Sequence, residues 1–155
     1  MAALRVLAQR RLTEAQLWTR LASKGYSDDD VRAAVAACKR DGFVDDAVFA
    51  QLFVDGRGKS VGNARLVAEL VRRGIERESA QRSVAAAERA EDERLHHALE
   101  KLFRTRASLS YPSAARALER LGFPAPAIYR HLRARALSDM AGNDAPAEDS
   151  FEIAT

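Results

Sequence analysis

The sequence predicts an all-α fold in which three tandem three-helix repeats form an elongated, curved array. Three stretches share a leucine, a glycine four residues later and then a hydrophobic residue, and their glycines lie 49 and 48 residues apart. The stretches are Leu21–Tyr26, Leu70–Ile75 and Leu118–Phe123. Aromatic residues make up only 6% of the 155 residues, whereas alanine, leucine, valine, arginine and glutamate are abundant. This composition favours helices over sheets, and small helical units of this kind usually stack, with a concave side that binds.

Each recurring glycine is predicted to end a helix in a left-handed conformation. The residue just after a helix often has a positive φ, which glycine adopts without strain. The hydrophobic residue that follows is then expected to pack back on the last helical turn. Apolar residues also recur six and ten positions after each glycine, as Val31 and Val35 in the first repeat, and mark one face of the next helix. The pattern predicts a helix, a glycine corner and a second helix three times.

One more helix before each of these pairs brings the expected number to nine. These helices are expected at about 2–10, 45–56 and 92–106. Thr13 and Gln16 have capping-box spacing after the first of them.

Several residues are suited to the predicted helix ends. Ser27 is expected to cap the third helix, and Pro124 suits the start of the ninth. The break between the sixth and seventh helices is placed near residues 88–91, and a loop with three glycines is expected from Gly56 to Asn63.

The charge is distributed unevenly along the chain. Residues 139–155 contain five acids and no base, so residues 1–138 hold 25 bases against 17 acids, a net charge of +8. We predict one repeat domain over 1–138, with repeats at about 2–43, 44–90 and 91–138, and a disordered acidic tail over 139–155. Residues 101–138 alone hold eight bases and one acid, which indicates a polyanion or an acidic protein groove as partner.

Secretion and membrane insertion have no support in the sequence. The chain has one cysteine, which excludes an intramolecular disulfide, and its first ten residues do not resemble a secretion signal. Charged residues interrupt every apolar run before it reaches the roughly 20 residues needed to cross a bilayer. We therefore expect a cytoplasmic protein without a membrane span.

Catalytic and metal-binding motifs are also missing. No glycine-rich loop follows a predicted strand, no nucleophile lies in a known turn motif, and no zinc-ligand spacing occurs. Asp45 and Asp46 suit helix capping better than a metal site. His96 and His97 point about 100° apart on a helix, and Cys38 falls on an apolar stripe. The expected protein is non-enzymatic and needs no cofactor.

The stretch from Gly42 to Ala50 resembles the signature of the RecX family, a glycine and two hydrophobic residues followed by (Asp/Asn)-Asp-x-x-Phe-Ala. The first-repeat stretch from Arg11 to Tyr26 also resembles that family. Further matching positions follow the signature at the family's spacing: Arg57, Gly62, Arg65, Glu69, Leu70, Arg73, Gly74 and Ile75. The resemblance covers roughly residues 3–137, and Asn63 departs from it where the family often has proline.

The resemblance implies a protein that binds the RecA recombinase and regulates its filament on single-stranded DNA, mainly by inhibition. It implies roles in DNA recombination, DNA repair and the SOS response. We expect a monomer that acts by occupying a site on the filament. Direct contact with DNA is a further expectation. Two alternatives stay open, a direct DNA-binding helical module and a generic helical-repeat adaptor for another protein.

Basic residues are the predicted contacts with the filament, because arginine offers a fork of donors to carboxylates and phosphates. We refer to the following ten residues as the basic set: Arg57, Lys59, Arg65, Arg72, Arg73, Arg104, Arg116, Arg120, Arg130 and Arg133. The alternative is an ordinary solvated face, and Glu69 can quench Arg65 and Arg73 at four-residue spacing. Trp18 and Tyr129 are expected to pack against the apolar stripes rather than to stack on bases.

Overall fold

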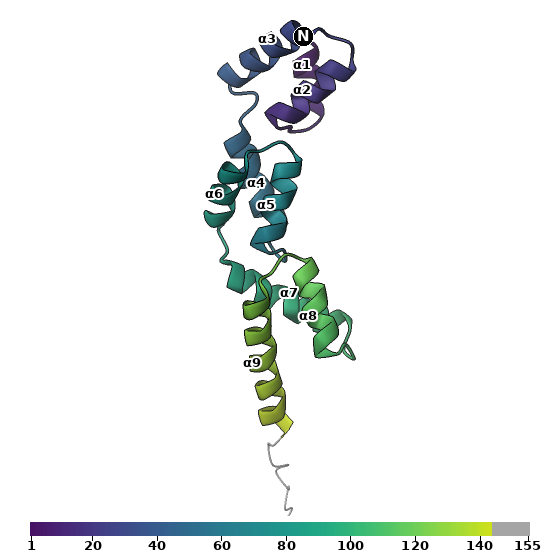
Figure 1. The fold of residues 1–155 in the computed structure, drawn as a ribbon, viewed down its shortest axis with the longest axis vertical. Coiled ribbons are helices and arrows are strands. Elements are labelled where there is room, and N and C mark those ends of the chain that lie inside the picture. The colour runs from purple at the N-terminus through teal and green to yellow at the C-terminus, as the bar shows by residue number, and fades with distance from the viewer. Residues whose placement is uncertain (144–155) are drawn as a thin grey trace, which may run out of the picture.

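The computed structural model describes residues 1–143 and contains nine α-helices over that range. The helices are α1 (Ala2–Gln9), α2 (Glu14–Ser23), α3 (Asp28–Arg40), α4 (Asp46–Arg57), α5 (Asn63–Arg72), α6 (Arg77–Ala85), α7 (Glu91–Thr105), α8 (Tyr111–Arg120) and α9 (Ala125–Asn143). They form three bundles of three consecutive helices that follow one another along the long axis (Figure 1). The predicted all-α, elongated, curved array of three tandem repeats is confirmed. None of the described helices is long and apolar enough to span a membrane.

Each repeat has its own hydrophobic core. The buried apolar side chains fall into three separate clusters, one from α1–α3, one from α4–α6 and one from α7–α9. Leu21, Leu70 and Leu118 occupy the equivalent position on the middle helix of each repeat, four residues before the corner glycine, and are buried. Burying one such side chain contributes about 2 kcal/mol. Since the cores are separate, the contacts between repeats determine how the array holds together.

The glycine corners have the predicted backbone conformation. Gly25, Gly74 and Gly122 have φ angles of 90°, 89° and 88°. In the second and third repeats the following residue, Ile75 or Phe123, is buried and returns its N–H to the helix, as predicted. In the first repeat the prediction is wrong, because Tyr26 is 46% exposed. That corner lies at the end of the array, where no earlier repeat covers it (Figure 1).

The predicted helix ends hold with two corrections. The capping box of Thr13 and Gln16 is present with both hydrogen bonds at 3.1 Å, and Ser27 caps α3. The break before α7 is also confirmed. However, Gly56 belongs to α4 rather than to the loop, because that helix continues to Arg57.

The end of α9 also differs from the prediction. The helix continues to Asn143, so residues 139–143 are helical and not part of an irregular tail. Asp139 explains part of this extension, since its carboxylate accepts a hydrogen bond from the Tyr111 hydroxyl at 3.2 Å and lies 3.9 Å from Arg135. The rest of the predicted tail, residues 144–155, lies outside the described residues.

Neighbouring repeats are joined by one recurring pair of hydrogen bonds. At the first junction, the Thr13 hydroxyl donates to the carbonyl of Arg73 at 2.6 Å, and the Asp46 carboxylate accepts from the Glu14 N–H at 2.8 Å. Thr13 is the N-cap of α2, and Arg73 precedes the corner Gly74. The corner of repeat two therefore sits on the N-terminus of the middle helix of repeat one.

The second junction repeats this arrangement between repeats two and three. Gly62, the N-cap of α5, donates its N–H to the carbonyl of Leu121 at 2.8 Å, and Leu121 precedes the corner Gly122. The Glu91 carboxylate accepts from the Asn63 N–H at 2.7 Å. An acid at the first position of the next repeat thus caps the middle helix of the preceding one, as Asp46 does at the first junction.

Arg94 contributes buried hydrogen bonds to the second junction. Its side chain is almost fully buried. The guanidinium donates to the carbonyls of Val61 at 2.5 Å and Arg89 at 3.2 Å, and to the side-chain oxygen of Asn63. Burial lowers the pKa of Arg94, and the nearby Glu91 opposes this shift. One buried side chain of α7 therefore donates to the hydrogen-bond acceptors of the loop that enters α5. The sequence did not predict this role.

Candidate partner-binding surface

Glu69 on α5 lies at the centre of three members of the basic set. Its side chain is 8% exposed, and Arg57 donates from Nε and Nη2 to its two carboxylate oxygens at 3.2 and 3.0 Å. Arg65 donates to the same carboxylate at 3.1 Å, whereas Arg73 donates to the Glu69 backbone carbonyl at 2.9 Å. The predicted pairing with Arg65 is confirmed, and the stronger, two-bond pairing with Arg57 was not foreseen. We call these four residues the Glu69 cluster.

The Glu69 cluster stays ionised at neutral pH. The hydrogen bonds from Arg57 hold the pKa of Glu69 below its usual range; burial acts in the opposite direction, and Arg65 adds to the lowering. The bond to Glu69 in turn raises the pKa of Arg57. Two guanidinium groups therefore share one carboxylate, and a third, that of Arg73, bonds the backbone carbonyl of the same residue. The side chains of Arg57 and Arg65 are 50% and 40% exposed, so they present N–H groups to solvent and to a partner.

Contacts beyond Glu69 hold these arginines in place. Arg65 also donates from Nη1 to the carbonyl of Arg120 at 3.3 Å, which links the cluster to α8 of the third repeat. The guanidinium of Arg73 lies 4.5 Å from the centre of the Phe53 ring. Side chains that are ordered before a partner arrives lose less conformational entropy on binding. The cluster is thus a pre-organised set of donors.

Six members of the basic set are exposed and form no ion pair within residues 1–143. They are Lys59, Arg72, Arg104, Arg116, Arg120 and Arg133. Arg116 contacts only the hydroxyl of Ser113, at 3.3 Å. Arg116 and Arg120 lie one turn apart on α8 and share a face of that helix, as the spacing predicts. These six residues have charges that no carboxylate of the described chain neutralises.

Arg130 differs from these six because it helps to hold the third repeat together. It donates to the Asp92 carboxylate at 2.5 Å, and His131 Nε2 lies 3.0 Å from the same oxygen. The contact with His131 and then that with Arg130 lower the pKa of Asp92. This carboxylate on α7 therefore attaches α7 to α9. It also neutralises part of the charge that Arg130 was predicted to offer a partner.

The two aromatic residues named in the sequence analysis have different environments. Trp18 packs partly buried against the core of the first repeat, as predicted. Tyr129 is 57% exposed, so the prediction that it packs is wrong. It lies in a shallow hollow on α9 together with Arg130 and Arg133. Both residues lie beside an apolar stripe in the sequence, so this position does not predict whether the side chain is packed or exposed.

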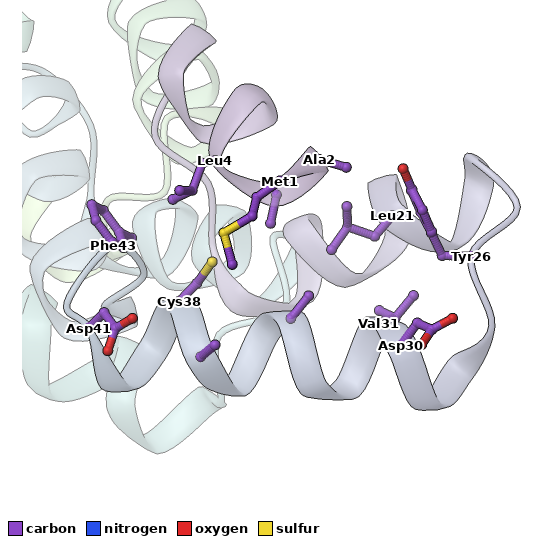
Figure 2. A pocket seen from close by; sticks show the side chains of 13 residues that line it. Met1, Ala2, Leu4, Leu21, Tyr26, Asp30, Val31, Cys38, Asp41 and Phe43 are labelled. Atoms are coloured by element: carbon purple, nitrogen blue, oxygen red, sulfur yellow. The ribbon is translucent and has the colours of Figure 1, made fainter.

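The first repeat contains an apolar pocket of about 330 Å³ between α1 and α3. Figure 2 shows Leu4 and Cys38 at this pocket, with Tyr26 and Phe43 at opposite ends. Cys38 is buried as predicted, and burial, followed by the charge of Asp41, raises the pKa of its thiol. No basic side chain lines the pocket. It is therefore separate from the basic set, which lies on repeats two and three.

Comparison with known proteins gives the family of this chain. The family model described as RecX, first three-helix domain, matches residues 1–38. A regulatory protein RecX from Thermus thermophilus is 32% identical over 122 residues, which cover 79% of this chain and 81% of that relative. The chain belongs to the RecX family. A crystal structure of RecX from Lactobacillus salivarius has the same fold, with a TM-score of 0.76 at 18% identity over 88% of this chain and 93% of that one.

The match to some RecX relatives is partial. The regulatory protein RecX of Caldanaerobacter subterraneus is 36% identical over 77 residues, which cover 49% of this chain but only 39% of that relative. The resemblance stated from the residues between Gly42 and Ala50 is nevertheless confirmed by the longer matches. The matched relatives are named regulatory proteins.

The RecX signature of this chain contributes caps to two helices of neighbouring repeats. Asp45 caps its own helix by accepting from the Val48 N–H at 3.1 Å, whereas Asp46 caps α2 of the preceding repeat. Val44 and Ala50 are buried. Adjacent carboxylates that look like a metal pair in the sequence thus cap two different helices.

Asn63 shows how the chain accommodates its departure from the usual RecX proline. Its N–H donates to Glu91, and its side-chain oxygen accepts from the buried Arg94. Proline would have no N–H to donate and no side-chain acceptor. In this chain the position therefore takes part in the second junction through two polar contacts.

Proposed function

We propose that this RecX-family chain regulates the RecA recombinase filament on single-stranded DNA, mainly by inhibiting it, and so modulates DNA recombination and repair. Family membership supports the partner, and the Glu69 cluster with its link to Arg120 is the observation that supports the contact surface. This surface runs along α5 and continues onto α8. It suits an anionic groove made by a protein filament and its DNA.

In the proposed mechanism the chain catalyses no reaction and acts by occupying the filament groove. A narrow array of three repeats follows a groove and touches more than one filament subunit, so its presence hinders subunit exchange, entry of a second DNA strand or the ATP-coupled cycle. Repeats that are tied by hydrogen bonds at both junctions keep the basic side chains at set spacings. We further propose that the chain acts as a monomer in the cytoplasm.

The basic set divides into two proposed roles. Arg57, Arg65 and Arg73 present fixed donors that select the partner's geometry. The exposed residues without a carboxylate partner, above all Arg116 and Arg120, supply attraction that depends on salt. Charge reversal at Arg116 and Arg120 is therefore the cleanest test, because among the hydrogen bonds of residues 1–143 it removes only the exposed one from Arg116 to the Ser113 hydroxyl.

The test measures RecA-dependent ATP hydrolysis on single-stranded DNA with and without this protein. We expect the wild type to lower the rate, and Arg116→Glu with Arg120→Glu to lose most of that inhibition while helix content by circular dichroism is kept. The matched control is Arg32→Glu with Arg77→Glu, which changes the charge equally at exposed positions on α3 and α6. Unchanged inhibition in the first variant contradicts the assignment of repeat three, and no inhibition by the wild type contradicts the function itself.

A second candidate function is a DNA-binding module that acts without the recombinase. The exposed Tyr129 beside Arg133 favours it, because an aromatic ring among basic side chains suits stacking on a base. Titration of the protein with bare single-stranded DNA and with RecA-coated DNA, at near-physiological salt, separates the two functions. Equal affinity for both ligands would support the DNA-binding module over the filament regulator.

A further inference from the structure

A second basic feature lies at the first junction, away from α8. A groove of about 270 Å³ runs between α2 of the first repeat and the C-terminal end of α5 in the second. Its lining consists of Arg10, Arg20, Arg72, Arg73, Ala15, Gln16, Thr19 and Gly74. Four guanidinium groups from two repeats thus line one groove that contains no acidic side chain. We call it the junction groove.

The walls of the junction groove are held in a defined position. The Thr13 hydroxyl donates to the Arg73 carbonyl directly behind it, and Gly74 packs so closely on Ala15 that an added Cβ would overlap the Ala15 Cβ. These contacts fix the backbone that carries the arginines. The groove is therefore a property of the joined repeats and exists in neither repeat alone.

The charges in the junction groove are available to a ligand. Arg10, Arg20 and Arg72 are exposed and form no ion pair with any carboxylate of residues 1–143. Arg73 is held by the Glu69 backbone carbonyl and the Phe53 ring, neither of which cancels its charge. Like charges that gather in one place repel each other, and an anion between them removes that repulsion.

We propose that the junction groove binds the phosphodiester backbone of single-stranded DNA. Arginine forks match the oxygens of a phosphate, and such contacts attract by charge without reading sequence. The centre of a protein interface normally offers large apolar anchors, whereas the apolar residues lining this groove are only Ala15 and Gly74. The chemistry therefore suits a nucleic-acid backbone better than an acidic protein segment.

The junction groove also divides the basic residues between two ligands. This division rests on the proposed function, which assigns the Glu69 cluster and α8 to the recombinase. It moves Arg72 from the recombinase to the DNA strand, together with Arg10 and Arg20, and Arg73 borders both regions. Helix α5 carries both groups, because Arg65 near its start reaches the third repeat while Arg72 at its end lines the groove. One helix thus connects the two contact regions.

The experiment measures the anisotropy of a fluorescein-labelled oligothymidylate of about 20 nucleotides as the full chain is added, at salt from about 50 to 200 mM. We expect Arg10→Ala with Arg20→Ala to weaken binding about tenfold at the lowest salt. The slope of log K against log salt should fall by about 1.4, since each lost phosphate contact contributes about 0.7 for single strands. Arg10→Lys with Arg20→Lys keeps the charges and should retain most of the binding.

The matched control is Arg32→Ala with Arg77→Ala, which removes two exposed charges outside the groove. It should bind within about twofold of the wild type, since only local phosphate contacts set the salt slope. The proposal is overturned if the wild type does not bind at about 50 mM salt, if the groove variant binds normally, or if both variants lose binding equally. Displacement of the oligonucleotide by polyglutamate at the same concentration of charge also overturns it. Because no recombinase is present, failure here is distinct from failure of the ATP hydrolysis test.

Discussion

The two junctions of the array share their hydrogen bonds but differ in what surrounds them. Each joins the N-cap of a middle helix to the carbonyl before the next glycine corner, and each adds a carboxylate from the next repeat. The second junction is filled by the buried Arg94 and by close backbone contact between Gly62 and Gly122. The first has the close contact of Gly74 with Ala15 but no buried charged side chain like Arg94, and the junction groove beside it stays open.

This difference shows that one local pattern can produce two kinds of joint. The shared bonds come from the ends of helices, which leave N–H and C=O groups that need partners. Side chains added around the bonds then decide whether the joint is filled and rigid or open and charged. Substitutions in the shared bonds and in the surrounding side chains should therefore lower the free energy of unfolding by different amounts.

Alanine substitutions at the corner glycines should separate packing at the junctions from backbone strain. All three corners have nearly the same positive φ, but an added Cβ at Gly122 would lie 2.6 Å from the backbone nitrogen of Arg65, whereas Gly25 has nothing within 4 Å. We expect Gly122→Ala to lower the free energy of unfolding by about 3 kcal/mol, from strain plus overpacking. Gly25→Ala should cost about 1 kcal/mol from strain alone.

Urea denaturation followed by circular dichroism measures both values. Gly74→Ala should fall between them, because the obstacle there is the methyl group of Ala15 rather than backbone. Equal losses at Gly25 and Gly122 would show that the close packing of Gly122 against Arg65 adds nothing to the cost of backbone strain.

Removal of the buried guanidinium should loosen the second junction and leave the first unchanged. Arg94→Met keeps much of the apolar stem but leaves the carbonyl of Val61 and the side chain of Asn63 without their donor. The expected loss is about 2 to 3 kcal/mol, the usual range for hydrogen bonds to a charged group. Amide hydrogen exchange should accelerate at Asn63 but not at Glu14, the equivalent residue of the first junction; matched acceleration at both sites would refute the separation.

Glu69 connects the two junctions through its arginines, and its loss should have the smallest of these junction effects. We expect Glu69→Gln to destabilise the protein by about 2 kcal/mol at neutral pH, because the amide cannot accept from Arg57 and Arg65 as a carboxylate does. The lowered pKa of Glu69 means that its stabilisation is complete above the unfolded value of about 4.3 and is lost as pH falls through the folded value.

The pH dependence gives this prediction its own control. The stability difference between wild type and Glu69→Gln should stay constant from about pH 7 down to the unfolded-state pKa of about 4.3 and shrink below it, as the wild-type carboxylate becomes protonated through its lowered folded-state pKa. A difference that stays constant as pH falls well below about 4.3 would show that packing of the side chain, and not its charge, stabilises the protein.

Local features of the fold were predictable from the sequence. The glycine corners, the capping box at Thr13 and the break before α7 depend on residues within a few positions of one another. The hydrogen bond between Asp46 and Glu14 joins residues 32 positions apart, and the one between Arg94 and Asn63 joins residues 31 apart. Periodicity carries no information about such pairs, because they exist only once the repeats are stacked.

The candidate site was predictable as a composition but not as an arrangement. The spacing of Arg65 and Glu69 predicted one ion pair, yet Arg57 reaches the same carboxylate from another helix. Arg10 and Arg20 were not singled out, because each is an ordinary surface residue until the second repeat docks beside it. Tyr26 and Tyr129 were predicted to pack but are exposed, since they lie in the terminal repeats, where no further repeat covers them.

The recurring junction gives the array a direction, so its two ends are chemically different. The first repeat presents an unused corner at Gly25, and the third presents an unused N-cap at Ser110, whose hydroxyl turns to its own helix. The first-repeat end therefore offers the carbonyl side of a junction, and the third-repeat end offers the N-cap side. Adding a fourth repeat after the third would require a hydrogen-bond donor at the N-cap of α8, an acid at the start of the added repeat and a glycine at its corner.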